Sequence, residues 1–435
     1  MAIDNKDKKV LKSSIEREQN EVACSAECEK IKGSKNLNVP HLRFTEFSGE
    51  WKEELLDRIA TLSKGIGIPK EQLSEDGDPC ILYGELYTKY KSEIIKQVES
   101  KTDIDGSKLK RSKANDVIIP CSGETAVDIA TARCVPFDSI LLGGDLNVIS
   151  LHKYDGAFMS YQLNGKRKYD IARVAQGVSV VHLYGEHLKT IKTYNPTLPE
   201  QQKIAILLSL LDERIATQNK IIEKYESLIQ AICDTLIEAE QHKVELSFND
   251  FGEPYSGLSG KSAEDFGKGW PYITYMNVYQ NQIIDITDVG LVKINETEQQ
   301  SVVRYGDILF TLSSETPDEV GMGAVYLGDA YPLYLNSFCF GVHITDESKI
   351  FPPFLAYYIS TKSFRKAVFP LAQGSTRFNL QKNDFMKKIF HFPTVKKQSE
   401  IYSVLKAYSN KLSIEKNIAN LLCEQKSYLL RQLFI

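Results

Sequence analysis

The chain has 435 residues, a hydrophobic fraction of 42%, a charged fraction of 25% and a formal net charge of −4. This length suits two or three domains that each bury a core. The composition is typical of globular protein. The slightly acidic balance gives no general case for nucleic-acid binding, so any basic surface must be local.

Cysteine and histidine spacing argues against a metal site. The eight cysteines include no CxxC pair, and the seven histidines form no HxxxH or HExxH group. We therefore expect no bound metal and a reducing compartment. Cys24 and Cys28 leave a metal or a disulfide open as an alternative to incidental thiols. No signal-peptide region and no membrane-length apolar run occurs. The sequence thus predicts a soluble, cytoplasmic protein.

Residues 1–39 are rich in Lys, Glu, Ser and Asn, which predicts a charged N-terminal extension. In residues 40–195, short β-like runs alternate with turns, and this predicts a first β-rich domain. Within it, residues 89–113 hold eight Lys or Arg against four acidic residues. Such a stretch is typical of an exposed loop or hairpin arm.

Residues 196–241 carry a long apolar stripe that predicts a helix. Its steps alternate between four and three, with Gln218 as the one polar member. This heptad spacing is typical of a helix whose seam faces another helix. A helix lying on a globular core is the alternative. The stripe consists of Ile204, Leu208, Leu211, Ile215, Ile222, Tyr225, Ile229, Ile232 and Leu236.

A second β-rich region occupies residues 242–392, and a second heptad pattern fills residues 393–435. Glu415 is aligned with Gln218 when the two helices are superimposed as repeats. A second copy favours pairing of the two stripes over coverage of a core. The second stripe consists of Ile401, Leu405, Tyr408, Leu412, Ala419, Leu422, Leu429 and Leu433.

Further matches show that the whole chain is an internal repeat. The tripeptide AQG occurs at residues 175–177 and again at 372–374, and Gln201 is matched by Gln398. The offset drifts by a few residues between blocks, as loop insertions would cause. Two earlier blocks also match: Pro79, Tyr83 and Tyr87 with Pro271, Tyr275 and Tyr279, and Ser122, Glu124 and Thr125 with Ser313, Glu315 and Thr316.

Connectivity and charge predict that the two helices pair antiparallel. Residues 196–240 carry four basic and eight acidic residues, whereas residues 393–435 carry seven and three. The two helices should therefore attract one another across their flanks. At 1.5 Å per residue the seam would be about 50 Å long, enough for a rigid spacer between two domains. Two domains simply tethered by surface helices is the alternative.

No catalytic motif is visible in the sequence. There is no GxxxxGK[ST] phosphate loop, no GxSxG nucleophile motif, no DPPY- or NPPY-like methyl-transfer motif and no nuclease-like carboxylate group. We therefore expect no catalytic residues and no cofactor in this chain, and a binding or scaffolding role.

Three sequence runs carry a resemblance to a known family. They are PHLRFTEFSGEW ending at Trp51, TLPEQQKIA at Thr197–Ala205 and GSTRFNL at Gly374–Leu380. With the duplication, they resemble the DNA-specificity (S) subunit of type I restriction-modification systems over essentially everything from Pro40 to Ile435. The order and spacing of the motifs carry the likeness more than any single motif.

The resemblance implies an α/β (α+β-like) fold of two tandem pseudo-repeats. Each repeat would be a target-recognition domain followed by a conserved spacer helix, and the two helices would pack as an antiparallel coiled coil. Each domain would read half of a split, asymmetric site in double-stranded DNA. Methyltransferase (modification) subunits and restriction (motor-nuclease) subunits would be the partners. S-adenosylmethionine is then expected in a partner subunit, and the chain itself would not be an enzyme.

DNA contacts should come from Lys and Arg for phosphates and from Asn, Gln, Arg, Ser and Thr for bases. Arg377 is the strongest candidate, and Val180 at the matching place of the first domain puts an equivalent contact there in doubt. A coiled-coil scaffold that joins two protein-binding domains without touching DNA is the alternative function. The DNA-contact candidates are Lys108, Lys110, Arg111, Lys113, Lys166, Arg167, Lys168, Asn277, Ser375, Thr376 and Arg377.

Overall fold

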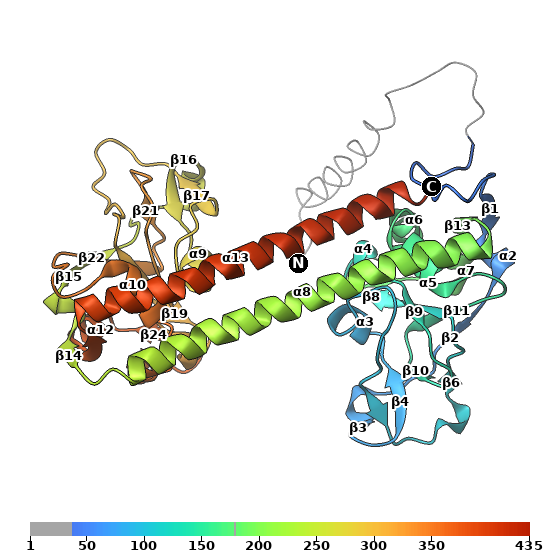
Figure 1. Ribbon diagram of the computed structural model, residues 1–435, viewed down its shortest axis with the longest axis horizontal. Coiled ribbons are helices and arrows are strands. Elements are labelled where there is room, and N and C mark those ends of the chain that lie inside the picture. Colours follow the sequence, from blue (N-terminus) through green and yellow to red (C-terminus); the bar gives the residue numbers. More distant parts are fainter. Residues whose placement is uncertain (1–36, 178–179) are drawn as a thin grey trace, which may run out of the picture. The chain divides into compact units, whose positions relative to one another are not determined.

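The computed structural model describes residues 37–177 and 180–435, and its helices and strands are labelled in Figure 1. Most of the expected extension at residues 1–39, with Cys24 and Cys28, lies outside the described residues. The rest of the chain forms two compact units. Unit 1 contains the described residues up to Arg214 together with Leu422–Ile435, and unit 2 contains Ile215–Leu421. Each unit therefore holds one α/β domain and one stretch of each long helix.

The domain of unit 1 is built on a four-stranded antiparallel sheet. Its strand Asp116–Pro120 is buried at every residue, because the apolar run Val117–Ile119 suits a central strand that is covered on both faces. In spatial order the strands are β2 (Ala60–Lys64), β11 (Leu146–Leu151), β7 (Asp116–Pro120) and β9 (Arg133–Val135).

Smaller sheets and short helices surround this sheet. A five-stranded sheet is made of β3 (Leu73–Ser74), β5 (Lys101–Thr102), β4 (Asp78–Ile81), β10 (Leu141–Leu142) and β6 (Lys110–Arg111). Two-stranded ribbons pair β1 (Lys52–Leu55) with β13 (Lys192–Asn195), and β8 (Ser122–Gly123) with β12 (Val181–His182). The helices are α2 (Leu56–Ile59), α3 (Glu85–Thr88), α4 (Ala126–Ile129), α5 (Gly156–Asn164), α6 (Lys168–Val174) and α7 (Gly185–Lys189).

The domain of unit 2 repeats this plan, which confirms the predicted pair of tandem repeats. Its four-stranded sheet has the order β15 (Gly252–Ser256), β22 (Cys339–Ile344), β18 (Ile308–Thr311) and β20 (Gly323–Val325). The register of the strand pairing also matches. The last residue of the edge strand, β2 or β15, lies opposite the second residue of the neighbouring strand, β11 or β22. These pairs are Lys64 with Asn147 and Ser256 with Phe340.

The other elements of unit 2 also have counterparts in unit 1. Its remaining strands pair as β17 (Val289–Val292), β16 (Phe266–Ile273) and β21 (Tyr334–Leu335), as β19 (Ser313–Ser314), β24 (Phe378–Leu380) and β23 (Ala372–Gln373), and as β14 (Lys243–Leu246) with β25 (Phe390–Pro393). Its short helices are α9 (Tyr275–Gln280), α10 (Pro352–Tyr358), α11 (Lys362–Val368) and α12 (Lys382–Lys387).

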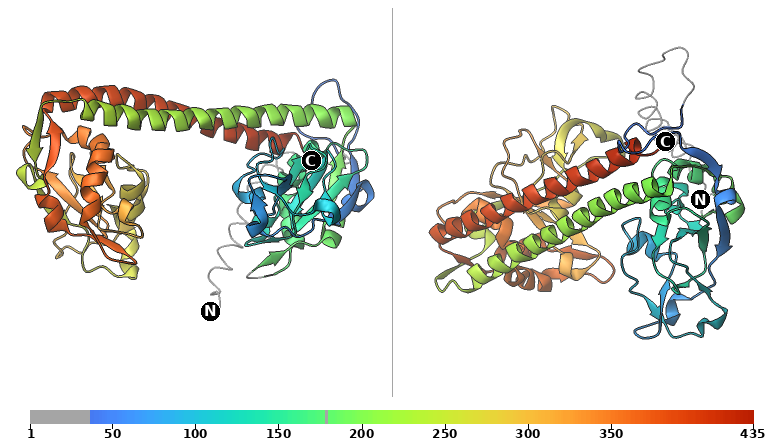
Figure 2. Two further views of the ribbon diagram at one scale, coloured as in Figure 1. Left: turned by 90° about the horizontal axis from the view of Figure 1, so that it is seen from below. Right: turned by 45° about the vertical axis from the view of Figure 1, so that its right-hand side comes forward.

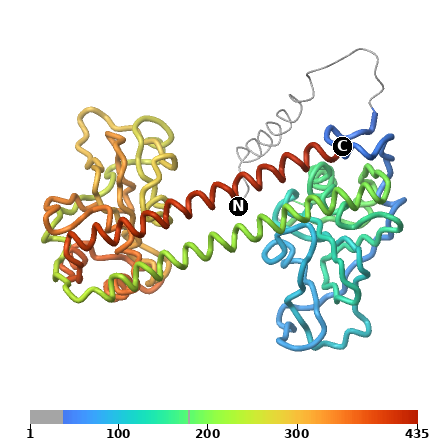
Figure 3. Tube along the Cα trace, viewed as in Figure 1, coloured from blue at the N-terminus to red at the C-terminus, as the bar shows by residue number. Residues whose placement is uncertain are grey.

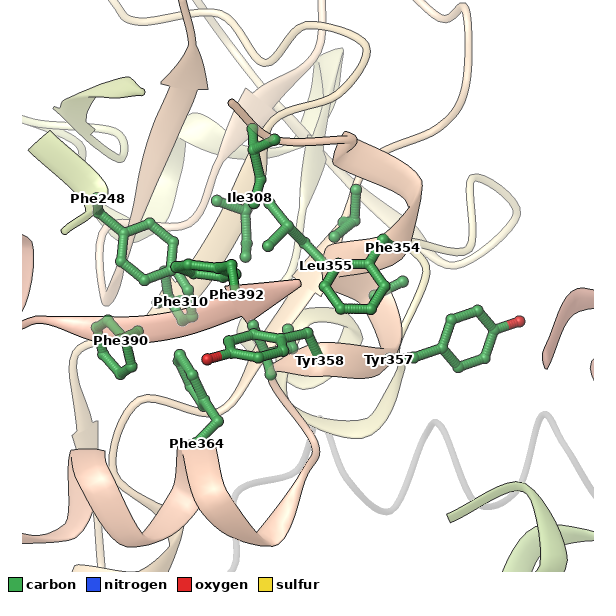
Figure 4. Packing of buried hydrophobic residues seen from close by; sticks show 14 of the residues in the cluster. Phe248, Ile308, Phe310, Phe354, Leu355, Tyr357, Tyr358, Phe364, Phe390 and Phe392 are labelled. Carbon is green, nitrogen blue, oxygen red and sulfur yellow. The ribbon is translucent and has the colours of Figure 1, made fainter. Parts of the chain in front are cut away.

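Aromatic side chains fill the core of unit 2 (Figure 4). Phe248 stacks on Phe385 with ring centroids 4.9 Å apart, and Phe364 stacks on Phe390 at 4.8 Å. The same apolar cluster includes Cys233 of the long helix that precedes the domain. The domain and its helices therefore share one core.

The two long helices are α8 (Leu198–Glu238), with 41 residues, and α13 (Val395–Gln432), with 38 residues. They run antiparallel in both units (Figure 2), which confirms the predicted pairing. In unit 1 the start of α8 packs on the end of α13, and in unit 2 the end of α8 packs on the start of α13. Every predicted seam residue is buried or half-buried, namely Ile204, Leu208, Leu211, Ile215, Ile222, Ile229, Ile401, Leu405, Leu412, Leu422, Leu429 and Leu433.

Polar pairs interrupt and flank the seam of unit 2. The amide of Gln218 donates to the Glu415 carboxylate at 2.6 Å, so the one polar residue of the first stripe meets its repeat counterpart. Beside them, Lys416 lies 2.7 Å from Glu226, a basic residue of α13 against an acidic residue of α8. This is the charge complementarity that the two compositions predict.

The first described residues of the chain pack against its last residues in unit 1 (Figure 3). The Leu42 amide donates to the Gln432 carbonyl at 2.9 Å. Trp51 packs edge-on against Phe158 and Phe434, with ring centroids 5.7 and 6.3 Å away. The first described residues and residues 433–435 therefore complete the same core.

A buried glutamine in the first turn of each long helix joins that helix to its domain. In unit 1, Gln201 accepts from the Asp155 amide at 2.9 Å and donates to the Pro196 carbonyl at 2.8 Å. In unit 2, Gln398 accepts from the Phe351 amide and donates to the Pro393 carbonyl, both at 2.8 Å. The two glutamines that match in the sequence therefore make the same pair of hydrogen bonds in each unit, and we call each pair a glutamine clamp.

Replacing Gln201 by alanine leaves the Asp155 amide and the Pro196 carbonyl without their hydrogen-bond partner. The free energy of unfolding of unit 1 should therefore fall by about 2–4 kcal/mol. Trp51 lies in the core of unit 1, whereas Trp270 belongs to unit 2. Denaturant titration of Trp51 fluorescence in a Trp270→Phe background therefore measures unit 1 alone. Gln202, which is exposed, is the control, and Gln202→Ala should be nearly neutral. Equal losses in the two variants would contradict the clamp.

Candidate nucleic-acid interface

The predicted basic cluster at Lys108–Lys113 lies around the edge strand β6. Lys108 and Lys113 are exposed and Lys110 is half-buried. Arg111 is already engaged: its guanidinium lies 2.5 Å from the Asp78 carboxylate and donates to the Ser139 carbonyl at 3.0 Å. Three lysines of this cluster therefore face solvent at least in part, and Arg111 holds the sheet edge together.

In the second basic cluster, Lys166–Lys168, the guanidinium of Arg167 is engaged within the protein. Arg167 lies over the Tyr194 ring at 5.3 Å, donates to the Ile435 carbonyl at 3.0 Å and lies 3.3 Å from Asp170. All three residues are half-buried, and burial lowers the pKa of Lys166. Arg167 thus fastens the end of the chain. The long-range packing of the chain end over this turn is not visible in the local sequence.

Asn277 is also corrected by the structure. It is fully buried, and its amide nitrogen donates to the carbonyls of Asp285 and Asp288 at 2.7 and 2.6 Å. Its counterpart in the repeat, Glu85, is buried and 2.8 Å from Lys89. Both side chains hold their own loops in shape and do not present polar atoms to a base.

The run Ser375–Arg377 forms an exposed hairpin turn between β23 and β24. Gly374 has a φ of +136°, and a Cβ there would lie 2.1 Å from the Arg377 carbonyl, so this turn requires glycine. Among the described residues neither the Ser375 nor the Thr376 hydroxyl caps the turn, which leaves both hydroxyls free for a partner.

Two aromatic side chains, Phe338 and Tyr275, interact with Arg377. Its guanidinium lies 6.0 Å from the ring centroid of Phe338, a side chain that is 58% exposed. Tyr275, which donates to the Ser313 carbonyl at 2.7 Å, is stacked on Tyr279 with centroids 5.9 Å apart. An exposed cation beside flat rings is suited to a nucleic acid, because phosphates take the charge and bases stack on rings.

In unit 1 the matching residues Gly177 and Val180, on either side of residues 178 and 179, have different chemistry. Gly177 has a φ of +124°, and a Cβ there would lie 2.1 Å from the Val180 carbonyl. Val180, which is exposed, stands where unit 2 has Arg377. Tyr87 donates to the Ser122 carbonyl at 3.3 Å, so the serine that matches Ser313 also accepts from a tyrosine, although Tyr87 is the counterpart of Tyr279 and not of Tyr275. Unit 1 therefore has valine where unit 2 has arginine.

Sequence reasoning missed Phe338, which is distant from Arg377 in the chain. Its exposure next to the turn at Gly374 is a tertiary property, whereas the GSTRFNL run and the repeat of AQG pointed to the turn itself. Among the described residues no group of His, Cys, Asp and Glu could hold a metal ion. The described part of the chain also contains no helix that is long and apolar enough to cross a membrane.

Two α/β domains with exposed basic and aromatic turns, each followed by a long helix that pairs antiparallel, define a duplicated recognition protein. The family model for the type I restriction modification DNA specificity domain matches twice, over residues 48–227 and 256–423. The chain therefore belongs to the family of type I restriction-modification DNA-specificity proteins, whose role is DNA sequence recognition and which is generally non-catalytic.

Solved structures show the same fold. The S subunit of a type I restriction-modification system from M. genitalium is 18% identical, with a TM-score of 0.52 over 91% of this chain and 99% of that chain. A chain from a study of complex assembly and conformational transition of the type I R-M system is 14% identical, with a TM-score of 0.54 over 88% and 97%. Comparison with curated protein sequences gives no match.

Arg377→Ala should weaken binding to the recognised DNA by about 1–3 kcal/mol, because a cation that contacts DNA is lost. The affinity is measured by fluorescence anisotropy with a labelled duplex. Arg304, exposed in the same unit, supplies the control, and Arg304→Ala should leave the affinity near wild type. Unchanged affinity in Arg377→Ala would remove this turn from the interface.

Proposed function

We propose that this chain is the DNA-reading subunit of a type I restriction-modification complex and recognises a split, asymmetric site. The observation that carries the proposal is the double match to the DNA-specificity domain, one match for each repeat. Two recognition domains of unequal sequence read two unequal half-sites. The different residues at the matched turn, Val180 and Arg377, are one source of this asymmetry.

The paired helices act as the spacer that sets the gap between the half-sites. Support comes from the uninterrupted 41 and 38 residues of α8 and α13 and from their apolar seam. An α-helix rises 1.5 Å per residue, so helix length converts directly into DNA length.

The chemistry resides in partner subunits. A methyltransferase subunit brings S-adenosylmethionine and transfers the methyl group, and a restriction subunit supplies motor and nuclease activity. This chain holds the DNA and the partners in place without a catalytic residue or a cofactor of its own. The absence of a methyl-transfer motif from the sequence agrees with this division of labour.

A strip of apolar side chains on the helices of unit 2 offers a docking surface for the methyltransferase subunit. In this unit the α/β domain packs on the side of the helix pair that carries Cys233 and Ser409. Leu228 and Val404 each directly precede a buried seam residue, so they lie on the other side of the seam. Ile414 and Leu421, seven residues apart and 52% and 63% exposed, continue the strip along α13. Exposed apolar residues at heptad spacing fit a partner helix.

Methylation mapping tests the spacer. The chain is expressed with the methyltransferase subunit of its own system, and modified sites are mapped by sequencing. A bipartite site is expected. Inserting seven residues after Gln218 and seven after Glu415 preserves the heptads, and should widen the gap by about 10 Å, or about three base pairs.

An unchanged gap in the insertion variant would contradict the spacer. A continuous short site in the wild type would contradict the split recognition. No sequence-specific modification or binding at all would favour a scaffold that does not touch DNA.

A second experiment tests the docking strip. The double change Ile414→Glu and Leu421→Glu should abolish co-purification with the methyltransferase subunit, because charge would replace apolar contact area. Since both side chains are exposed, the unfolding transition should change little. Asn417→Glu, at an exposed position of the same helix, is the control. Retained co-purification in the double variant would place docking elsewhere.

A further inference from the structure

Unit 1 contains a pocket of about 300 Å³ where strands β2 and β11 meet helix α7. Its walls include Lys64 at the end of β2, Asn147 on β11, and Tyr184 with Gly185 at the start of α7. None of these residues belongs to the basic clusters of the sequence, and Val180 lies only four residues before Tyr184 in the chain.

Lys64 is the unpaired cation of this pocket. Its ammonium lies 5.7 Å from the ring centroid of Tyr184, which is 45% exposed. The pocket also contains Glu186, but that carboxylate lies 2.7 Å from Lys189. No carboxylate of the described residues pairs with Lys64. A fixed aromatic neighbour and a free ammonium are suited to an anion from outside the chain.

Asn147 shows that the pocket floor is polar. The residue is 1% exposed, and its amide nitrogen donates to the Leu183 carbonyl at 2.9 Å. That bond fixes the orientation of the amide, so Oδ1 is the remaining acceptor. Oδ1 has no hydrogen-bond partner among the described residues, although buried polar atoms normally have one. A donor from outside, such as an ordered water beside a ligand, would complete it.

Unit 2 also has a lysine at the place equivalent to this pocket, but the lysine comes from the helix and not from the strand. Ser256 ends β15 as Lys64 ends β2, and Lys382 begins α12 as Gly185 begins α7. The Lys382 ammonium lies 3.4 Å from the Ser256 hydroxyl, so it occupies the place that Lys64 fills in unit 1. In the described chain Lys382 also lacks a carboxylate partner. Each repeat therefore keeps one uncompensated cation here, although the sequence positions differ.

We propose that Lys64 and Lys382 each bind a backbone phosphate of the DNA, at equivalent places of the two recognition domains. The proposal rests on the proposed function, because it assigns contacts within the same DNA-reading activity. In unit 1, where Val180 replaces the arginine of the turn, Lys64 beside Tyr184 is the cation of the reading surface. In unit 2, Lys382 adds to Arg377.

Salt dependence of binding tests the proposal. The full-length chain is titrated against a labelled duplex of mixed sequence, and against one that carries the methylated site, over a range of salt concentrations. Each bound phosphate contributes about 0.9 to the slope of log K against log salt. Lys64→Gln and Lys382→Gln should each reduce the slope by about this amount, and the double variant by about twice as much. The recognised sequence should not change.

Lys192 provides the matched control, since it is an exposed lysine of unit 1 that lies 2.6 Å from Glu53. Lys192→Gln should leave the slope unchanged, and Lys64→Arg should restore it. Wild-type slopes in both glutamine variants would overturn the phosphate contacts while leaving sequence-specific binding intact. Relaxed preference at one base pair would show that the lysine reads a base. If the wild-type chain bound both duplexes equally well, that result would count against the proposed function. The phosphate contacts would still be measured by the salt dependence of binding to the mixed-sequence duplex.

Discussion

Lys426 carries a positive charge into the interior of unit 1, and the arrangement of three chain segments depends on it. Its ammonium lies 2.6 Å from Glu93 of the domain and 2.6 Å from Asp212 of α8. Tyr161 donates to the same Asp212 at 2.7 Å. Burial alone would lower the pKa of Lys426, but the two carboxylates raise it above its ordinary value. Because a partly buried charge without a partner is costly, this ion cluster favours one register of the helices in unit 1.

The glutamine clamps and the Gln218–Glu415 bond act in the same way as this ion cluster. Apolar contacts along the seam supply most of the attraction, but a heptad stripe tolerates a shift by seven residues. Buried polar groups do not tolerate such a shift, because it would leave hydrogen-bond donors and acceptors without partners. Directional contacts at the two domains and on the seam therefore select one alignment from several that the apolar residues would accept.

The sequence predicted well whatever depends on periodicity or repetition. The heptad residues lie on the seam, and the matched Gln201 and Gln398 make matched bonds. It did not show which side chains are already engaged within the protein. Arg167 contacts the last residue, which is remote in the sequence, and Asn277 is buried against a loop only 8 to 11 residues away. The unpaired lysines, Lys64 and Lys382, sit at unmatched positions and become equivalent only in three dimensions.

Unit 2 is one continuous stretch of chain, whereas unit 1 needs the final residues from Leu422 onward. Leu433 and Phe434 fill the core around Trp51, and Lys426 neutralises Glu93 and Asp212. During synthesis the first half therefore cannot complete its fold until residues 422–435 have been made, after all of unit 2 has been made. This reverses the usual N-terminal-first order of multidomain proteins. A premature stop before Leu422 would leave the first-made half exposed as a substrate for proteolysis.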